Sequence, residues 1–88
     1  MGYPSDIERR RKNREFVAEY RATHSCVDCP ENDPACLDFD HDDPSKKSVD
    51  ISKAIKSYSL EKLKEEIAKC TVRCANCHRK RHAKERNS

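Results

Sequence analysis

The sequence predicts one small α+β domain that is held together by its cysteines more than by a hydrophobic core. Only thirteen of its 88 residues are Leu, Ile, Val or Phe, which is below the roughly 20% at which a chain usually forms an ordinary core. A chain with so few apolar residues would be disordered if its net charge were large. Here the formal net charge is only +3, and the chain contains six cysteines. A small domain with so little apolar surface needs cross-links of this kind. We expect a single compact domain, with residues 1–24 as a helical extension and residues 25–88 as the cross-linked part.

The start of the chain bears on how the cysteines cross-link it. Asp6 and Glu8 stand close to Arg9, Arg10 and Arg11, and the apolar segment of a secretory signal is missing. We therefore expect a cytoplasmic, monomeric protein whose thiols stay reduced and bind metal ions, with disulfide bonds as the alternative. No apolar run approaches the roughly 20 residues that a membrane span needs, so we expect no membrane association.

Charge is distributed unevenly along the chain. Residues 22–44 contain seven acids and no Lys or Arg, whereas residues 69–88 contain seven bases and a single acid. An acidic segment suits metal binding, and a basic one suits contact with a polyanion. The alternative is a solvated charged tail that improves solubility.

The N-terminal half predicts a helix, a turn and a strand. A weak apolar stripe indicates a helix over residues 6–21, and turn-forming residues follow it. Leu37, Phe39 and His41 then alternate with aspartates, which indicates a short strand. Because neighbours along a strand point to opposite faces, Asp40 and His41 can serve different partners.

The C-terminal half predicts a loop, a helix, a strand and a last helix. Residues 43–58 are polar and irregular, and we expect a loop there. Ser59 is a suitable N-cap for a helix over residues 60–69. Residues 70–74 have the composition of a strand and residues 75–86 that of a helix.

Two C-x2-C units offer four thiolates to one ion. They are Cys26, Cys29, Cys74 and Cys77. Four thiolates around Zn²⁺ form a closed, structural site, which contributes folding free energy on the order of 10 kcal/mol in zinc-finger peptides. His24 could replace one thiolate, although a surface position is the simpler expectation.

Two cysteines remain outside this set. Cys36 precedes the first predicted strand and Cys70 begins the second. We expect both to be buried near each other, because free cysteine behaves as a small hydrophobic residue. A second metal site or a disulfide bridge between them is the alternative.

His78 and His82 stand four residues apart in the last predicted helix. That spacing puts two imidazoles on one face, where they can bind a single ion. On its own such a pair is often accidental, but Asp40 could complete the site. A carboxylate with two imidazoles, and open positions for water and phosphate, suits a catalytic ion.

These residues resemble the HNH endonucleases, in particular small phage and bacterial members with a four-cysteine zinc site. Residues 37–41 resemble the first strand of that family, and residues 70–82 resemble its second strand and helix. The resemblance covers about residues 25–83. It implies a ββα-metal (His-Me finger) core, here with an N-terminal helix and an additional helix between the two core strands.

The resemblance also implies roles for individual residues. His41 would be the general base, while Asp40 and His78 would hold a catalytic Mg²⁺, Mn²⁺ or Ni²⁺ ion, with His82 as a further ligand. In many relatives an asparagine nine residues before the first helical histidine orients the base, and that position here is Lys69. Asn76 is the only asparagine nearby, so either it takes the orienting role or the role is missing.

The implied activity is hydrolysis of DNA phosphodiester bonds, by nicking or cleavage with low sequence specificity. The residues expected to hold flanking phosphates are Arg79, Lys80, Arg81 and Lys84. Relatives occur beside phage packaging genes, which implies packaging (terminase) proteins as further partners and a phage-encoded protein in a bacterial host. The alternative is a non-catalytic zinc module that binds nucleic acid or serves a packaging motor.

Overall fold

The computed structural model describes residues 6–86, which form four α-helices and one two-stranded antiparallel sheet. In chain order these elements are α1 (Asp6–Ala22), β1 (Leu37–His41), α2 (Ile51–Ser57), α3 (Leu60–Ile67), β2 (Cys70–Cys74) and α4 (Ala75–Arg86). Short 3-10 turns at Pro34–Cys36 and Pro44–Lys46 flank β1. The predicted small α+β class is confirmed. None of the helices in the described part of the chain has the length and apolar character needed to cross a membrane.

The two strands pair so that one face of the sheet is apolar and the other polar. Leu37 lies opposite Cys74 and Phe39 lies opposite Val72, on one face. Asp40 lies opposite Thr71 on the other face, because side chains alternate along a strand. The strand predicted from the alternation of residues 37–41 is confirmed.

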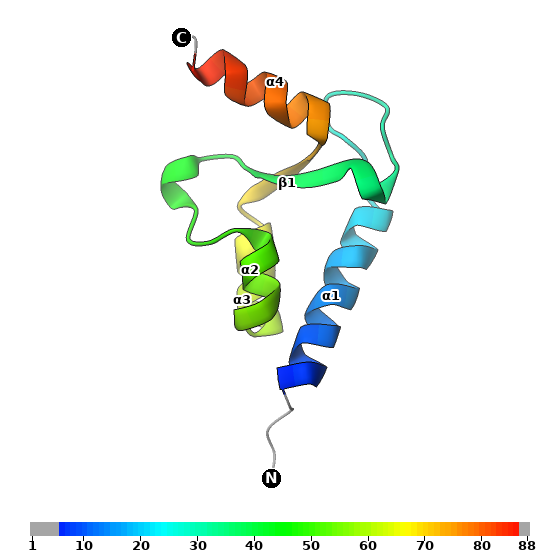
Figure 1. Cartoon of the computed structure of the whole chain (residues 1–88), viewed down its shortest axis with the longest axis vertical. Coiled ribbons are helices and arrows are strands. Elements are labelled where there is room, and N and C mark those ends of the chain that lie inside the picture. The colour runs from blue at the N-terminus through cyan, green and yellow to red at the C-terminus, as the bar shows by residue number, and fades with distance from the viewer. Residues whose placement is uncertain (1–5, 87–88) are drawn as a thin grey trace.

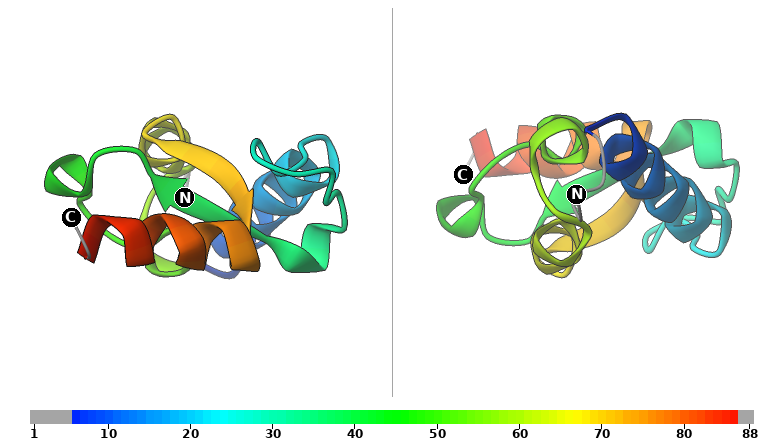
Figure 2. Two further views of the ribbon diagram at one scale, coloured as in Figure 1. Left: turned by 90° about the horizontal axis from the view of Figure 1, so that it is seen from above. Right: turned by 90° about the horizontal axis from the view of Figure 1, so that it is seen from below.

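The sheet separates two layers of helices. Figures 1 and 2 show α4 across one face of the sheet, while α1, α2 and α3 lie together on the other side. The buried apolar side chains between these three helices are Val17, Ile51, Ala54, Leu63 and Ile67. Phe39 packs against this cluster from β1. The small core therefore lies below the sheet, and polar groups from the opposite face meet α4.

Helix α2 occupies part of the segment that we expected to be a loop. Ile51, Ala54, Ile55 and Tyr58 have the spacing of one face of a helix, and the loop expectation overlooked this pattern. The helix is stabilised from α1, where the buried Asn13 donates from Nδ2 to the carbonyl oxygens of Ile55 (3.0 Å) and Tyr58 (2.7 Å). These carbonyls at the end of a helix have no partner within it. A side chain 42 positions away in the sequence therefore supplies the hydrogen-bond donor for a carbonyl group at the end of α2.

The expectation that Cys36 and Cys70 lie near each other is wrong. Cys70 lies opposite His41 at one end of the sheet. Cys36 directly precedes Leu37, which pairs with Cys74 at the other end. An antiparallel pairing of two five-residue strands therefore separates the two cysteines by the length of the sheet. Both are half-buried free thiols.

Candidate metal centres

Four cysteines converge between the loop after α1 and the junction of β2 with α4. One ligand atom from each of Cys26, Cys29, Cys74 and Cys77 lies within 4.8 Å of the others. The Sγ atoms of Cys29 and Cys74 are 3.6 Å apart, too far for a disulfide bond. All six cysteines are free thiols. This cluster could hold one metal ion, as the two C-x2-C units predict.

The backbone around this cluster stabilises negative charge on sulfur. The amide of Asp28 donates to Sγ of Cys26 at 3.4 Å, and that of Cys77 donates to Sγ of Cys74 at 3.5 Å. Burial raises the pKa of Cys26, but hydrogen bonds from backbone groups of Cys74 and Asp28 outweigh it and lower the pKa to about 6. The Cys74 thiol and burial raise the pKa of Cys77 to about 12. Four ionised thiols this close require a cation between them.

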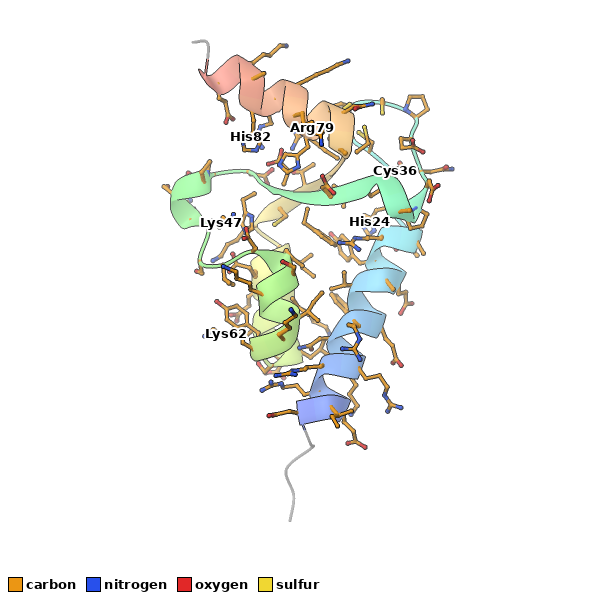
Figure 3. All side chains as sticks on the ribbon, in the orientation of Figure 1. His24, Cys36, Lys47, Lys62, Arg79 and His82 are labelled. Carbon is orange, nitrogen blue, oxygen red and sulfur yellow. The ribbon has the colours of Figure 1, made fainter. Side chains whose placement is uncertain are left out.

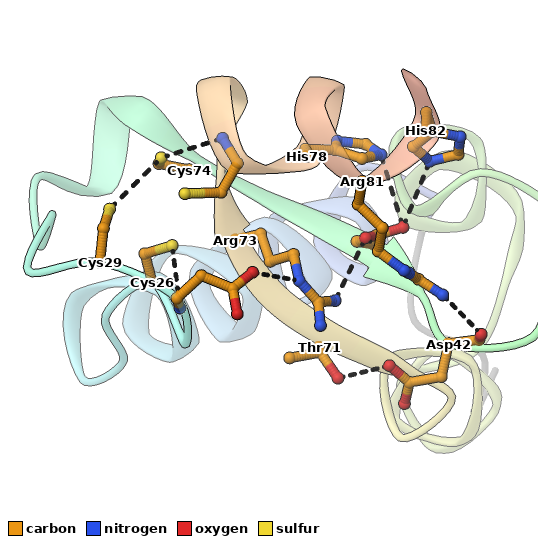
Figure 4. A network of polar contacts seen from close by, with 12 residues as sticks. Cys26, Cys29, Asp42, Thr71, Arg73, Cys74, His78, Arg81 and His82 are labelled. Carbon is orange, nitrogen blue, oxygen red and sulfur yellow. Dashed lines mark hydrogen bonds and ion pairs between the residues drawn. The ribbon is translucent and has the colours of Figure 1, made fainter. Parts of the chain in front are cut away.

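A second group of ligands lies between β1 and α4. Oδ1 of Asp40 is 3.5 Å from Nε2 of His78 and 3.5 Å from Nε2 of His82. Figure 4 shows the imidazoles of His78 and His82 side by side on α4. Asp40 is 2% exposed, whereas His82 is 46% exposed. These three side chains could also hold one metal ion, and the exposed side leaves room for further ligands.

The aspartate two positions before Asp40 fixes the orientation of His78. Oδ2 of Asp38 lies 3.2 Å from Nδ1 of His78. A carboxylate only accepts hydrogen bonds when ionised, so Nδ1 donates to Asp38, and Nε2 is the nitrogen that faces Asp40. Imidazoles that bind metals usually have such a second partner on the other ring nitrogen.

Two arginines hold the other oxygen of Asp40. Nη1 of Arg81 donates to Oδ2 at 2.7 Å, and Nη1 of Arg73 donates at 3.2 Å. Burial opposes ionisation of this carboxyl, but the Arg81 hydrogen bond and the nearby positive charges lower the pKa of Asp40 below its ordinary value. One oxygen is therefore tied to guanidinium groups, and Oδ1 alone faces the imidazoles.

Arg81 is consequently not the free phosphate-binding residue that we expected. Besides Asp40, its guanidinium donates to the carbonyl oxygens of His41 (3.2 Å) and Asp42 (2.8 Å). Three hydrogen bonds join the middle of α4 to the end of β1. The physical reason is its position, because residue 81 shares a helix face with His78 and His82.

One cavity joins the second ligand group to His41. It encloses about 330 Å³ and opens beside the end of β1. Its lining comes from the end of α1, from β1 and the segment after it, from the start of α2 and from α4: Arg21, Asp38, Phe39, Asp40, His41, Pro44, Lys47, Asp50, Ile51, Ser52, His78 and His82. Figure 3 shows His82 under α4 and Lys47 on the connection after β1, on two sides of this region. The shared cavity is the arrangement on which the sequence-based hypothesis depends.

His41 is held from the opposite face of the sheet. It is 8% exposed, and its Nε2 lies 2.8 Å from Oε2 of Glu66 on α3. Asn76, to which the sequence offered an orienting role, is exposed in the first turn of α4. Among the described residues the side chain that contacts the imidazole by a hydrogen bond is Glu66.

Comparisons with known proteins do not assign this chain to a family. No protein-family model, no curated protein and no solved structure matches the chain.

Three other basic residues of α4 lie on the surface. Arg79, Lys80 and Lys84 are exposed. Lys80 and Lys84 line a second hollow of about 440 Å³ beside Arg73. These three side chains are accessible to a partner, and their contact with phosphates stays a prediction.

His24 lies outside the four-thiol cluster, as its expected surface position requires. Its exposed ring stacks on Tyr20 with centroids 3.9 Å apart. Nδ1 of His24 is hydrogen-bonded to the carbonyl oxygen of Tyr20 at 2.6 Å.

Sequence reasoning missed several residues around the cavity. Arg21 comes from the end of α1, and its guanidinium lies 5.2 Å over the ring of Phe39. Lys47 comes from the connection after β1 and forms an ion pair with Asp50. Nothing in the local sequence singles these cations out. Asp38 could have been found, because it shares a strand face with Asp40.

Proposed function

We propose that this protein is a metal-dependent nuclease of the HNH type that hydrolyses phosphodiester bonds in DNA. The observation that supports it is the convergence of Asp40, His78 and His82 on one side of a cavity that His41 also lines. A possible ion site and a possible proton acceptor beside one solvent-accessible space are the minimum for this chemistry.

The order of the elements supports the same proposal. β1, β2 and α4 form an antiparallel pair followed directly by a helix across its face, which is the arrangement of a ββα-metal core. In the proposed enzyme, α2 and α3 are an insertion between the two core strands, and α1 packs against them. The four cysteines join the loop before β1 to the start of α4.

Two different ions suit the two groups of ligands. Four thiolates favour Zn²⁺ in a closed structural site. One carboxylate and two imidazoles, with an open side, favour Mg²⁺, Mn²⁺ or Ni²⁺ in a reactive site. The hydrogen bond from His78 to Asp38 fits this assignment, because it turns Nε2 toward Asp40. When bound, the ion supplies positive charge to the scissile phosphate and to the leaving 3′ oxygen.

His41 would accept the proton of the attacking water. Its Nε2 is occupied by Glu66, so Nδ1 is the nitrogen that remains for the proton. Water attacks phosphorus, the proton passes to Nδ1, and the bond to the 3′ oxygen breaks.

The basic residues would bind the DNA backbone on either side of the cut. Arg79, Lys80 and Lys84 are exposed on α4, and cations of this kind contact phosphates without selecting a base sequence. Arg21 and Lys47 line the cavity itself, and in this proposal they contact the phosphate that reacts. We therefore expect little sequence preference.

The test is a plasmid-nicking assay with a series of Mg²⁺, Mn²⁺ and Ni²⁺. We expect His41→Ala to lower the nicking rate by about 10²- to 10⁴-fold, the usual contribution of a general base. His24→Ala is the matched control, because His24 is an exposed histidine outside the cavity. Both variants should retain the zinc content and the far-UV spectrum of the original protein.

The assay also separates catalysis from simple binding. A zinc module that only binds nucleic acid would shift the mobility of DNA without nicking it under any ion. The nuclease proposal is overturned if purified protein with full zinc content leaves the plasmid intact. It is likewise overturned if His41→Ala nicks as fast as His24→Ala.

A further inference from the structure

A buried carboxylate lies directly behind His41. Glu66 is 3% exposed, and both of its oxygens are hydrogen-bonded. Oε2 contacts Nε2 of His41 at 2.8 Å and the backbone N–H of Ser48 at 3.1 Å. Oε1 accepts from Nζ of Lys69 at 3.0 Å. A buried glutamate with three partners is strongly constrained in position.

The ionisation of Glu66 determines the direction of its hydrogen bond to His41. Burial opposes the charged form, but hydrogen bonds from Lys69, His41 and Ser48 outweigh it and lower the pKa of Glu66 to about 2. The group is therefore a carboxylate at neutral pH, and a carboxylate only accepts hydrogen bonds. It follows that Nε2 of His41 carries a proton and donates a hydrogen bond to Oε2 of Glu66.

This contact settles which ring nitrogen of a neutral His41 has a lone pair. With the proton on Nε2, the lone pair is on Nδ1. Among the described residues Nδ1 has no hydrogen-bond partner. The ring also lines the cavity that contains Asp40, His78 and His82.

Lys69 extends the same arrangement by one residue. Its ammonium group binds Oε1 of Glu66, the carbonyl oxygen of Lys46 and the hydroxyl of Ser48. Lys46 and Ser48 belong to the segment that follows β1. One ammonium group therefore joins the carboxylate to the segment from which the cavity is partly built.

We propose that Glu66 is the positioning residue of His41: it fixes the neutral imidazole in the Nε2–H form, with Nδ1 free for the proton, and Lys69 holds the carboxylate in place. This inference rests on the proposed function where it concerns catalysis. Lys69 stands where many HNH relatives have the asparagine that orients the base. In this proposal it acts on His41 indirectly, through Glu66.

The first test measures the tautomer and does not depend on activity. In protein labelled with ¹⁵N-histidine, we would follow the two ring nitrogens of His41 through a pH titration and assign the tautomer in the pH range where the ring is neutral. We expect Nε2 to be protonated and Nδ1 to be unprotonated. A wild-type protein with the proton on Nδ1 would overturn the inference, whether or not it nicks DNA.

Glu66→Gln tests the cause. A glutamine has one acceptor oxygen where the carboxylate has two, and Lys69, Ser48 and His41 then compete for it. We expect the population of the Nε2–H form to fall. Glu65→Gln is the matched control, because it makes the same change at an exposed neighbour on α3. Equal tautomer populations in the two variants would contradict the positioning role.

The second test links the tautomer to the reaction. Loss of the outer partner of a metal-binding imidazole typically lowers activity by about 10- to 100-fold, and we expect a similar factor for the partner of a general base. We expect Glu66→Gln to lower kcat by that factor with KM unchanged, while Glu65→Gln matches wild type. An unchanged kcat in folded, zinc-loaded Glu66→Gln would refute the catalytic part. An inactive wild-type protein with the Nε2–H form would refute the nuclease proposal but not the control of the tautomer.

Discussion

Oδ2 of Asp38 lies 3.2 Å from Nδ1 of His78, on the side of the imidazole away from the ligand group. Asp38 and Asp40 are two positions apart on β1 and face the same helix. One of them contacts the outer nitrogen of His78, and the other faces its inner nitrogen at 3.5 Å. A single strand thus supplies both a candidate ligand and the group that orients a second candidate ligand.

Asp38→Asn should weaken ion binding at the second ligand group. The substitution removes the charge that holds the proton on Nδ1 of His78, and such outer-partner losses typically cost about 10- to 100-fold in metal affinity. Titration calorimetry with Mn²⁺ on zinc-loaded protein measures the change. Asp33→Asn is the control, because Asp33 caps a turn and asparagine caps equally well. Equal Mn²⁺ affinities in the two variants would show that Asp38 has no such role.

Cys29→Ser should abolish zinc binding at the four-cysteine cluster and destabilise the fold. The apolar core is small, and a structural zinc site supplies on the order of 10 kcal/mol of folding free energy. Zinc content and urea unfolding measure the effect. Cys36→Ser is the matched control, since Cys36 is also half-buried and lies outside the cluster. Retention of one equivalent of zinc by Cys29→Ser would contradict the assignment.

Glu66 should make stability depend on pH in acid. Its pKa is lowered from 4.5 to about 2, so its contribution is complete above pH 4.5 and is lost as the pH falls toward 2. The shift corresponds to at most about 3 kcal/mol. The stability advantage of wild type over Glu66→Gln should therefore shrink across this window.

Acid also displaces metal from thiolates in both proteins, so the measured quantity is the difference between their unfolding curves at each pH. Glu65→Gln provides the reference for loss of a charge at an exposed site. An advantage that stays constant from pH 6 to the lowest pH at which both proteins fold would contradict the linkage.

Lys84→Ala should weaken DNA binding and its dependence on salt. Each phosphate contact contributes about 0.9 to the slope of log affinity against log salt concentration, so the slope should decrease by about that amount. Fluorescence anisotropy with duplexes of unrelated sequence measures both quantities. Lys53→Ala is the control, because Lys53 is exposed on α2, on the other side of the sheet. Identical slopes for the two variants would remove α4 from the binding surface.

The parts of the fold that the sequence predicts are those set by local pattern. The strand at residues 70–74 and the helix at residues 75–86 agree with the predicted bounds. The helix predicted over residues 60–69 ends at Ile67 and has Ser59 as its N-cap, as expected. The four cysteines and the three residues Asp40, His78 and His82 also come together as their spacing predicts.

Helix α2 was missed although Ile51, Ala54 and Ile55 follow a helical spacing, but two of the contacts that were missed join distant segments. α2 is stabilised by Asn13, and His41 is bound by Glu66, which is 25 positions away. No pattern within either segment indicates the other. Arg81 is a different case, since its spacing from His78 places it on the inner face of α4. A run of basic residues suggests phosphate binding. The period of the helix shows which of these side chains points toward the sheet.

The polar face of the sheet has a consequence for how the last helix is attached. None of residues 75–85 is buried, so α4 has no apolar stripe that would dock it by exclusion of water. The side chains that attach α4 to the rest of the protein are thiols at its start, and imidazoles and a guanidinium further along the helix. The local opening of α4 is therefore linked to occupancy of the two ligand groups, and its amide hydrogens should exchange with deuterium faster than those of α3 when chelators are present.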